Sequence, residues 1–195
     1  MSFSSYNGFL RRVGRSVVLP VKTIKRIVEK DVFNSTRIEE CVDFGAGTLF
    51  WAKWLKKRCS NTIAVDRIYS DITTCDGIKC VSDIDDALEL LSGKSDKMIW
   101  MCDVLHHLDN DFIDSLLKKI SSFDVIIIKD INCNKRFGNA MNRLHDRLIN
   151  GETIIDINPF SLRTNLINMG YKVKLLSIRR LWYPHFLLIA KKKTV

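Results

Sequence analysis

Apolar residues in this chain form short runs that alternate with amphipathic stretches. From Ile38 onward, runs typical of buried strands are separated by stretches in which apolar positions recur at helical spacing. The strands expected from this pattern are 41–44, 62–66, 77–81, 97–102 and 124–128, and the helices are 49–58, 83–91 and 112–120. This alternation predicts an α/β fold: a doubly wound, mostly parallel sheet with helices on both faces.

The last third of the chain breaks this alternation. Two helices are expected at 137–150 and 161–169, followed by two strand-like runs at 171–177 and 185–190. Only a short turn around Trp182, Tyr183 and Pro184 separates these runs. Because so short a link cannot hold a crossover helix, the two strands should pair as a C-terminal antiparallel hairpin at the edge of the sheet. The expected sheet then has about seven strands.

Residues 1–36 form an expected N-terminal basic helical extension. From Val21, the apolar positions 21, 24, 27 and 28 fit one helical face, and Pro20 is tolerated in the first turn. The helix either packs on the sheet or lies as a basic amphipathic helix on an anionic membrane. The sequence pattern leaves both alternatives open.

Length and composition favour one domain that holds one core. The chain has 195 residues, 46% of them hydrophobic, and its net charge of +9 points to an anionic partner: nucleic acid, a phosphorylated small molecule or a membrane surface. The six cysteines lie far apart and offer no metal-binding spacing, so no metal is expected and the thiols are interpreted as reduced, in a cytosolic protein. No secretion signal and no apolar span of about 20 residues is evident in the sequence.

A pair of glycines follows the first expected strand, in Asp43-Phe44-Gly45-Ala46-Gly47-Thr48, and Asp66 ends the next strand. Close glycines allow a tight turn near a ligand, and a carboxylate about 20 residues later can accept bonds from both ribose hydroxyls of an adenosine. The third glycine of the dinucleotide fingerprint is Phe50 here, which we interpret as evidence against NAD or FAD because that position needs close helix–strand packing. No Lys-Ser or Lys-Thr of a P-loop follows the glycines.

These segments resemble class I S-adenosylmethionine (SAM)-dependent methyltransferases of the small-molecule type. The likeness covers roughly 38–130 and includes the glycine segment, Ala64-Val65-Asp66, Val81-Ser82-Asp83 and the stretch 101–108, which contains Val104-Leu105-His106-His107-Leu108. It implies a single methyltransferase domain over 1–195, with SAM held by 37–130 and the acceptor by the helices and hairpin of 131–195. The cofactor contacts it implies are Asp43, Gly45, Ala46 and Gly47 near the methionine end, Asp66 on the ribose, Asp83 on the adenine, and Cys102 and Asp103 beside the methionine.

Four positions leave a question open. Leu49 stands where many members have a third glycine, and we expect the backbone path to survive the change. Asp43 and Asp66 could instead be strand-end caps, and Asp83 could be a helix N-cap.

The acceptor side is expected where the fourth and fifth strands end. An alcohol acceptor needs its proton removed, and histidine suits that task. We predict that His107, Lys129, Asp130 and His145 line the acceptor pocket as the catalytic group. The alternatives are ordinary hydrogen-bonded histidines, His106 and His185 included, and a self-contained Lys129–Asp130 salt bridge.

The predicted reaction is O- or N-methylation of a small-molecule or carrier-linked acceptor, which could be a sugar or a phosphorylated compound. The cations of Lys135, Arg136, Arg143 and Arg147 would bind phosphate or carboxylate on it, or would form a solvated helix face. Methylation of RNA or DNA and a non-catalytic SAM-binding partner module are the alternatives, with nucleic acid the less favoured partner. The expected location is the cytoplasm, with peripheral membrane contact through the N-terminal helix as a further hypothesis.

Overall fold

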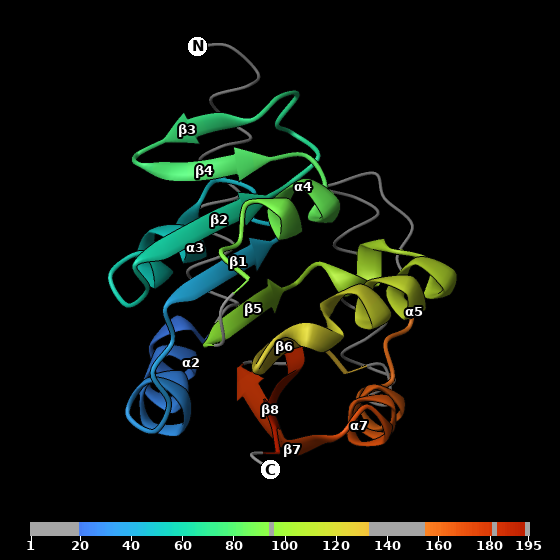
Figure 1. The fold of residues 1–195 in the computed structure, drawn as a ribbon. Helices are drawn as coiled ribbons and strands as arrows, with labels where there is room; N and C mark the ends of the chain where they lie inside the picture. The colour runs from blue at the N-terminus through green and yellow to red at the C-terminus, as the bar shows by residue number, and fades with distance from the viewer. Residues whose placement is uncertain (1–19, 94–95, 133–154, 181–182, 194–195) are drawn as a thin grey trace, which may run out of the picture.

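The computed structural model describes residues 20–93, 96–132, 155–180 and 183–193, which form a mixed sheet of eight strands with helices on both faces (Figure 1). The strand order is β3-β4-β2-β1-β5-β6-β8-β7. The strands are β1 Glu40–Phe44, β2 Asn61–Val65, β3 Thr73–Cys75, β4 Ile78–Val81, β5 Lys97–Cys102, β6 Val125–Ile131, β7 Tyr171–Arg180 and β8 Tyr183–Lys192. The predicted α/β class with a mostly parallel sheet is confirmed.

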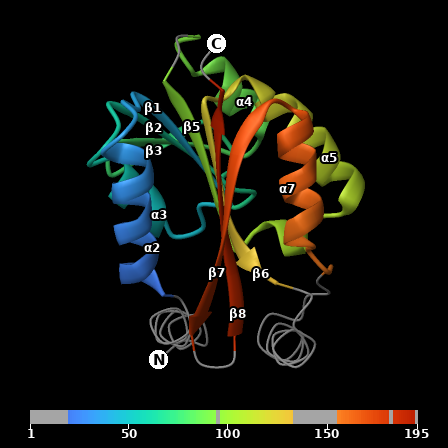
Figure 2. The same cartoon turned by 90° about the horizontal axis from the view of Figure 1, so that it is seen from below.

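Helices cover the two faces of this sheet separately. Seen from below, α2 and α3 lie on one side, and α5 and α7 lie on the other (Figure 2). The helical segments are α2 Val21–Val28, η1 Glu29–Phe33, α3 Phe50–Leu55, α4 Ile84–Glu89, η2 Leu105–His107, α5 Asn110–Lys119, η3 Ile120–Ser122 and α7 Pro159–Asn168. The helix expected at 137–150 lies outside the described residues.

The interior strand β6 shows how the sheet is buried on both faces. Ile126 and Ile128 pack into the cluster under α4, α5 and α7, whereas Val125 and Ile127 pack into the cluster under α2 and α3. Successive side chains of a strand point to opposite faces, so an unbroken apolar run fits a strand covered on both sides. β6 continues past this run to Ile131 and carries Lys129 and Asp130 into the sheet.

The C-terminal hairpin forms at the edge of the sheet as predicted. β8 pairs antiparallel with both β6 and β7, so one reversed strand lies between two strands of the opposite direction. The Tyr171 hydroxyl, at the start of β7, donates to the carbonyl oxygens of Ser121 (3.0 Å) and Phe123 (2.7 Å). These bonds fasten the hairpin to the segment that enters β6.

The sheet has one strand more than the expected seven or so. β3 is a three-residue strand, Thr73–Cys75, that pairs antiparallel with β4 at the other edge of the sheet. Its side chains are exposed or half-buried, so no apolar alternation marks it in the sequence.

The N-terminal helix packs on the sheet, one of the two alternatives for this segment. Ile24 and Val28 of α2 and Val32 of η1 are fully buried with α3 and the sheet. The apolar side of the helix is therefore covered by protein and is not available for insertion into lipid. Among the described residues, no helix combines the length and apolar character needed to cross a bilayer.

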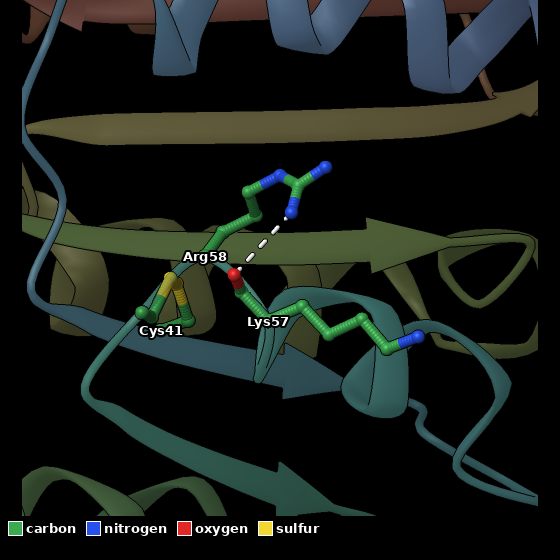
Figure 3. Close-up of a disulfide and its surroundings, with 4 residues drawn as sticks. Cys41, Lys57 and Arg58 are labelled. Atoms are coloured by element: carbon green, nitrogen blue, oxygen red, sulfur yellow. Dashed lines mark hydrogen bonds between the residues drawn. A yellow bond between two sulfur atoms is a disulfide. The ribbon is translucent and has the colours of Figure 1, made fainter.

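Two cysteines correct the expectation that all six thiols are reduced. Cys41 in β1 and Cys59 after α3 form a disulfide, which lies beside Lys57 and Arg58 (Figure 3). Both cysteines are buried. The expectation of free thiols holds for Cys75 and Cys80, and also for Cys102, while Cys133 lies outside the described residues.

Candidate functional site

The glycine segment makes a tight loop between β1 and α3. Gly45 and Gly47 both have positive φ, +77° and +48°, which glycine adopts without steric cost. The amides of Gly45 and Ala46 donate to the Val65 carbonyl at 2.8 and 3.1 Å, and the Gly47 amide donates to Asp66 Oδ2 at 2.7 Å. The loop is thus fastened to the end of β2, where the predicted acidic residue lies.

The two glycines differ in the space around them. A Cβ on Gly45 would lie 2.5 Å from Val104 Cγ2 and 2.7 Å from Val104 Cβ, so the loop packs directly against the segment that follows β5. A Cβ on Gly47 would meet nothing nearer than Asp66 Oδ2, at 4.0 Å. The loop is therefore closed at Gly45 and open at Gly47, beside a carboxylate.

Leu49 and Phe50, the two residues after Thr48, stand where other glycine-rich turns have glycine. Leu49 has φ +62° and is 6% exposed, so it adopts the left-handed conformation that glycine would supply, and the backbone path survives as expected. Phe50 is the first residue of α3, and its side chain is 37% exposed. Its side chain therefore lies at the surface of α3 and not between helix and strand.

Asp66 and Tyr69 hold the open side of the loop. Asp66 Oδ1 accepts from the Ile68 amide at 3.2 Å, and the Tyr69 hydroxyl donates to the Gly47 carbonyl at 3.0 Å. Burial, followed by the nearby Cys80, raises the pKa of Tyr69, so the hydroxyl keeps its proton. Sequence analysis did not predict Tyr69 as a site residue. Its position three residues after Asp66 could have indicated that it lies near the loop.

The other two predicted carboxylates on the cofactor side have different surroundings. Asp43 lies in β1, 1% exposed, paired in register with Ala64 and Trp100. Asp83 is exposed at the end of β4, and its Oδ1 accepts from the Asp85 amide at 2.8 Å, which caps α4. This is the N-cap geometry considered from the sequence, and the adenine contact of Asp83 stays a prediction.

A buried ion pair joins the ends of β5 and β6. The side chain of Lys129 is fully buried and pairs with Asp103, whose side chain is 36% exposed and whose φ is +55°. Burial raises the pKa of Asp103, but the positive charge of Lys129, supported by His185 and His106, outweighs it and lowers the pKa overall. Burial, with the Asp103 charge, raises the pKa of the neighbouring Cys102 thiol well above its usual value. An ionised carboxylate beside a neutral thiol therefore faces this edge.

Asp130 belongs to a second polar group, on the opposite face of the sheet. It lies 2.5 Å from Nδ1 of His106 and accepts from the amides of Leu105 (3.1 Å) and Ile131 (2.7 Å). Because Lys129 and Asp130 point to opposite faces, the salt bridge between them that we considered does not form. Asp130 holds His106, which sequence analysis had not placed in the catalytic set, and the His107 ring lies against His106 with centroids 4.0 Å apart.

These contacts bring most of the predicted site residues to one edge of the sheet. Asp43, Gly45, Ala46, Gly47 and Asp66 lie at the ends of β1 and β2, and Cys102, Asp103, His107, Lys129 and Asp130 lie at the ends of β5 and β6. The contact of Gly45 with Val104 joins the two groups. His145 and the cations Lys135, Arg136, Arg143 and Arg147 lie outside the described residues. The described residues contain no cluster of three or more His, Cys, Asp or Glu that could hold a metal ion.

Comparison with known proteins gives matches only among solved structures. No family model matches the chain, and no curated protein matches it. A SAM-dependent methyltransferase from Archaeoglobus fulgidus matches with a TM-score of 0.66 at 19% identity, over 88% of this chain and 94% of that one. Magnesium protoporphyrin IX methyltransferase from Synechocystis, with bound S-adenosylhomocysteine (SAH), matches with a TM-score of 0.57 at 16% identity. The match covers 99% of this chain and 89% of that one.

A third match is an RNA repair complex. The Pnkp1/Rnl/Hen1 RNA repair complex gives a TM-score of 0.55 at 14% identity, over 86% of this chain and 40% of that one. At such identities the three likenesses concern the fold.

Proposed function

We propose that this chain, whose fold is that of the class I SAM-dependent methyltransferases, is a single-domain enzyme that binds SAM and transfers its methyl group to an acceptor. The observation that carries the proposal is the carboxylate of Asp66 at the open side of the glycine loop, bonded to the Gly47 amide. Residues 37–130 would hold the cofactor and 131–195 would build the acceptor side.

The residues at the loop fit the cofactor's chemistry. Each Asp66 oxygen accepts one backbone amide and keeps a further lone pair, so the carboxylate can also accept from two ribose hydroxyls. The open space at Gly47 leaves room for the nucleoside, and Gly45 and Ala46 shape the turn. In our proposal Asp43 takes the amino end of the methionine, Cys102 and Asp103 border that end, and Asp83 takes the adenine.

When bound, SAM supplies an electrophilic methyl carbon on its sulfonium. The protein's task is then to align the acceptor atom and, for an alcohol, to remove its proton. Nδ1 of His106 lies 2.5 Å from Asp130, so in our proposal Nδ1 donates to this carboxylate and a base role of His106 would use Nε2. We therefore add His106 to the proposed catalytic group of His107, Lys129, Asp130 and His145, with Asp130 as the residue that orients it.

We propose a small-molecule or carrier-linked acceptor, methylated on oxygen or nitrogen. The compact polar groups at the ends of β5 and β6 support this, since they offer a few fixed charges rather than an extended surface. RNA methylation is the second candidate, supported by the net charge of +9 and by the likeness to the RNA repair complex. The predicted cytoplasmic location stays a prediction, and the Cys41–Cys59 disulfide is uncommon in that compartment.

Calorimetric titration with SAH tests the cofactor site. Asp66→Asn should weaken binding about 10- to 100-fold, because hydrogen bonds to a charged group contribute about 1.5–3 kcal/mol. Asp71→Asn is the matched control, since Asp71 is an exposed carboxylate five residues further on. The proposal fails if wild-type protein gives no heat with SAH, or if the two variants bind it equally.

Transfer is tested with labelled SAM and fractionated cell extract. Label should enter one fraction, and both His106→Gln and His145→Ala should reduce turnover far more than SAH affinity. Unchanged turnover in either variant removes that histidine from the catalytic group. Binding of SAH without label in any fraction would instead indicate a non-catalytic partner module.

A further inference from the structure

Charge is strongly segregated along this chain. Residues 1–58 carry twelve Lys and Arg against five Asp and Glu, residues 59–132 carry seven against fourteen, and residues 133–195 carry twelve against three. The acidic middle segment builds the helices α4 and α5, with Asp83, Asp85, Asp86, Glu89, Asp111 and Asp114. The basic first segment builds α2 and α3, which cover the other face of the sheet (Figure 2). The sheet therefore separates an acidic side from a basic side.

The basic side continues from α3 across α2 to the C-terminal hairpin. Arg58, after α3, pairs with Glu29 of η1 at 2.6 Å, and Lys174 of β7 pairs with Asp31 of η1 at 2.7 Å. Lys191 of β8 donates to the Ser35 hydroxyl at 2.7 Å. These contacts join segments far apart in the sequence into one surface, which we name the α2 face and define by Lys22, Lys25, Arg26, Lys30, Lys57 and Lys172.

The cations of the α2 face are only weakly neutralised by the protein itself. Lys22, Arg26 and Lys30 are exposed and follow one another at four-residue spacing, so they form a row about 12 Å long. Within the described part of the chain, none of the six defining residues forms an ion pair. Like charges at this spacing destabilise a helix slightly, so this row of cations does not stabilise the fold.

Lys25 shows how closely the positive charges approach one another. Its ammonium lies 5.3–5.6 Å from the ring centroids of Phe50, Trp51 and Trp54. Burial, followed by the charges of Lys57 and Arg58, lowers its pKa. The α2 and α3 cations therefore act on an approaching partner as one positive field.

We propose that the α2 face docks on a membrane surface that carries anionic lipids, by electrostatic contact without insertion. Ile24, Val28 and Val32 are buried in the core, so only the charged side of the helix can meet the headgroups. A two-sided charge distribution orients a protein on a charged plane, with its basic side inward. The proposal goes beyond methyl transfer, and it would bring the enzyme to acceptors linked to a lipid carrier.

A nucleic acid is the other polyanion that such a surface could meet. Sites for single-stranded nucleic acid combine a positive track with several aromatic platforms on which bases stack. Among the described residues of α2, η1 and α3, Phe50 is the one exposed aromatic side chain, because Trp51 and Trp54 are buried and Phe33 is half-buried. The α2 face offers a spread of charge rather than a row of stacking rings, which favours a lipid surface.

Vesicle sedimentation with the full chain tests the proposal. Wild-type protein should sediment with phosphatidylcholine vesicles that contain 30% phosphatidylglycerol at low salt. It should be released at 0.5 M NaCl and should not bind pure phosphatidylcholine. Lys22→Gln/Arg26→Gln/Lys30→Gln should weaken binding about 100-fold, since each cation near the surface contributes about fivefold. The control Lys118→Gln/Lys119→Gln/Arg163→Gln removes the same charge from α5 and α7 on the other side.

Both triple variants should keep wild-type SAH affinity, which separates this proposal from the cofactor site. The control also removes the exposed ion pair of Lys119 with Asp85, which should change the unfolding free energy by no more than about 1 kcal/mol. Equal loss of vesicle binding in the two variants overturns the proposal, because it would reflect net charge alone. Binding that survives 0.5 M NaCl, or no binding at low salt, also overturns it. Tight, salt-dependent binding of single-stranded RNA without vesicle binding would assign the α2 face to nucleic acid instead.

Discussion

Alanine at Gly45 should destabilise the protein far more than alanine at a glycine that shares only its backbone conformation. Two costs combine at Gly45. A φ of +77° costs a residue with a Cβ about 1–2 kcal/mol, and the new Cβ would lie 2.5 Å from Val104 Cγ2, an overpacking that costs about 1–3 kcal/mol. The expected loss in the free energy of unfolding is about 2–5 kcal/mol.

Gly93 supplies the matched control. Its φ is +74°, but a Cβ there would meet no atom within 4 Å, so Gly93→Ala carries the conformational cost alone. Urea unfolding measures both variants. With a slope of about 2 kcal/mol per M, Gly45→Ala should lower the midpoint by about 1–2.5 M and Gly93→Ala by about 0.5–1 M.

Val104→Ala tests the named contact directly. It removes the two γ-methyl groups, so a double-mutant cycle with Gly45→Ala should recover roughly 1 kcal/mol of the loss. Equal midpoints for Gly45→Ala and Gly93→Ala, or no coupling between Gly45 and Val104, would refute the reasoning that the glycine is required by the contact between the loop and the end of β5.

Three further changes follow from contacts already described. Asp103→Asn should cost about 2 kcal/mol at pH 7, less than for a fully buried pair because Asp103 is a third exposed. Because the folded-state pKa of Asp103 is lowered, this contribution is fully present above pH ~4 and is lost as the pH falls further. The difference in unfolding free energy between variant and wild type should therefore shrink in acid, and a constant gap would contradict it. Cys41→Ser/Cys59→Ser opens a loop with a sequence separation of 18 and should lower the free energy of unfolding by about 3 kcal/mol, measured by thermal unfolding. Reduction should lower the stability of the wild type by the same amount and leave that of the variant unchanged. Tyr171→Phe leaves two carbonyl oxygens without their donor and should cost about 1–3 kcal/mol. Burial raises the pKa of Tyr171 to about 12, so between pH 10 and 12 the wild type should lose more stability than the variant.

The sequence specified the sheet well because its strands are strongly patterned. The run 125–128 is apolar at every position, and the short link before His185 rules out a crossover, so this interior strand and the reversed hairpin were both predictable. β3 was not predictable, since Thr73–Cys75 is largely exposed and has no apolar face. The disulfide was not predictable either, because Cys41 and Cys59 meet only when β1 and the end of α3 pack together.

Some residues of the candidate site were predictable from the sequence, and some of the contacts between them were not. Local rules placed Gly45, Gly47 and Asp66, because a turn between strand and helix needs positive φ and the next parallel strand ends at the same edge. Partners across the sheet were beyond such rules. That Lys129 pairs with Asp103 and Asp130 with His106 depends on which face each side chain meets, and adjacent residues in the sequence give no sign of this.

The neighbouring charges at the end of β6 also fix how that strand aligns with its partners. Its isoleucines are apolar toward both sides, so a slip by one residue would exchange one isoleucine for another at little energetic cost. The same slip would turn Asp130 toward Asp103, which sets two carboxylates against each other in the interior, and it would take Lys129 away from its carboxylate partner. The two residues proposed for chemistry thus also act as an alignment key, and exchanging them for each other should produce a misregistered sheet rather than a merely inactive protein.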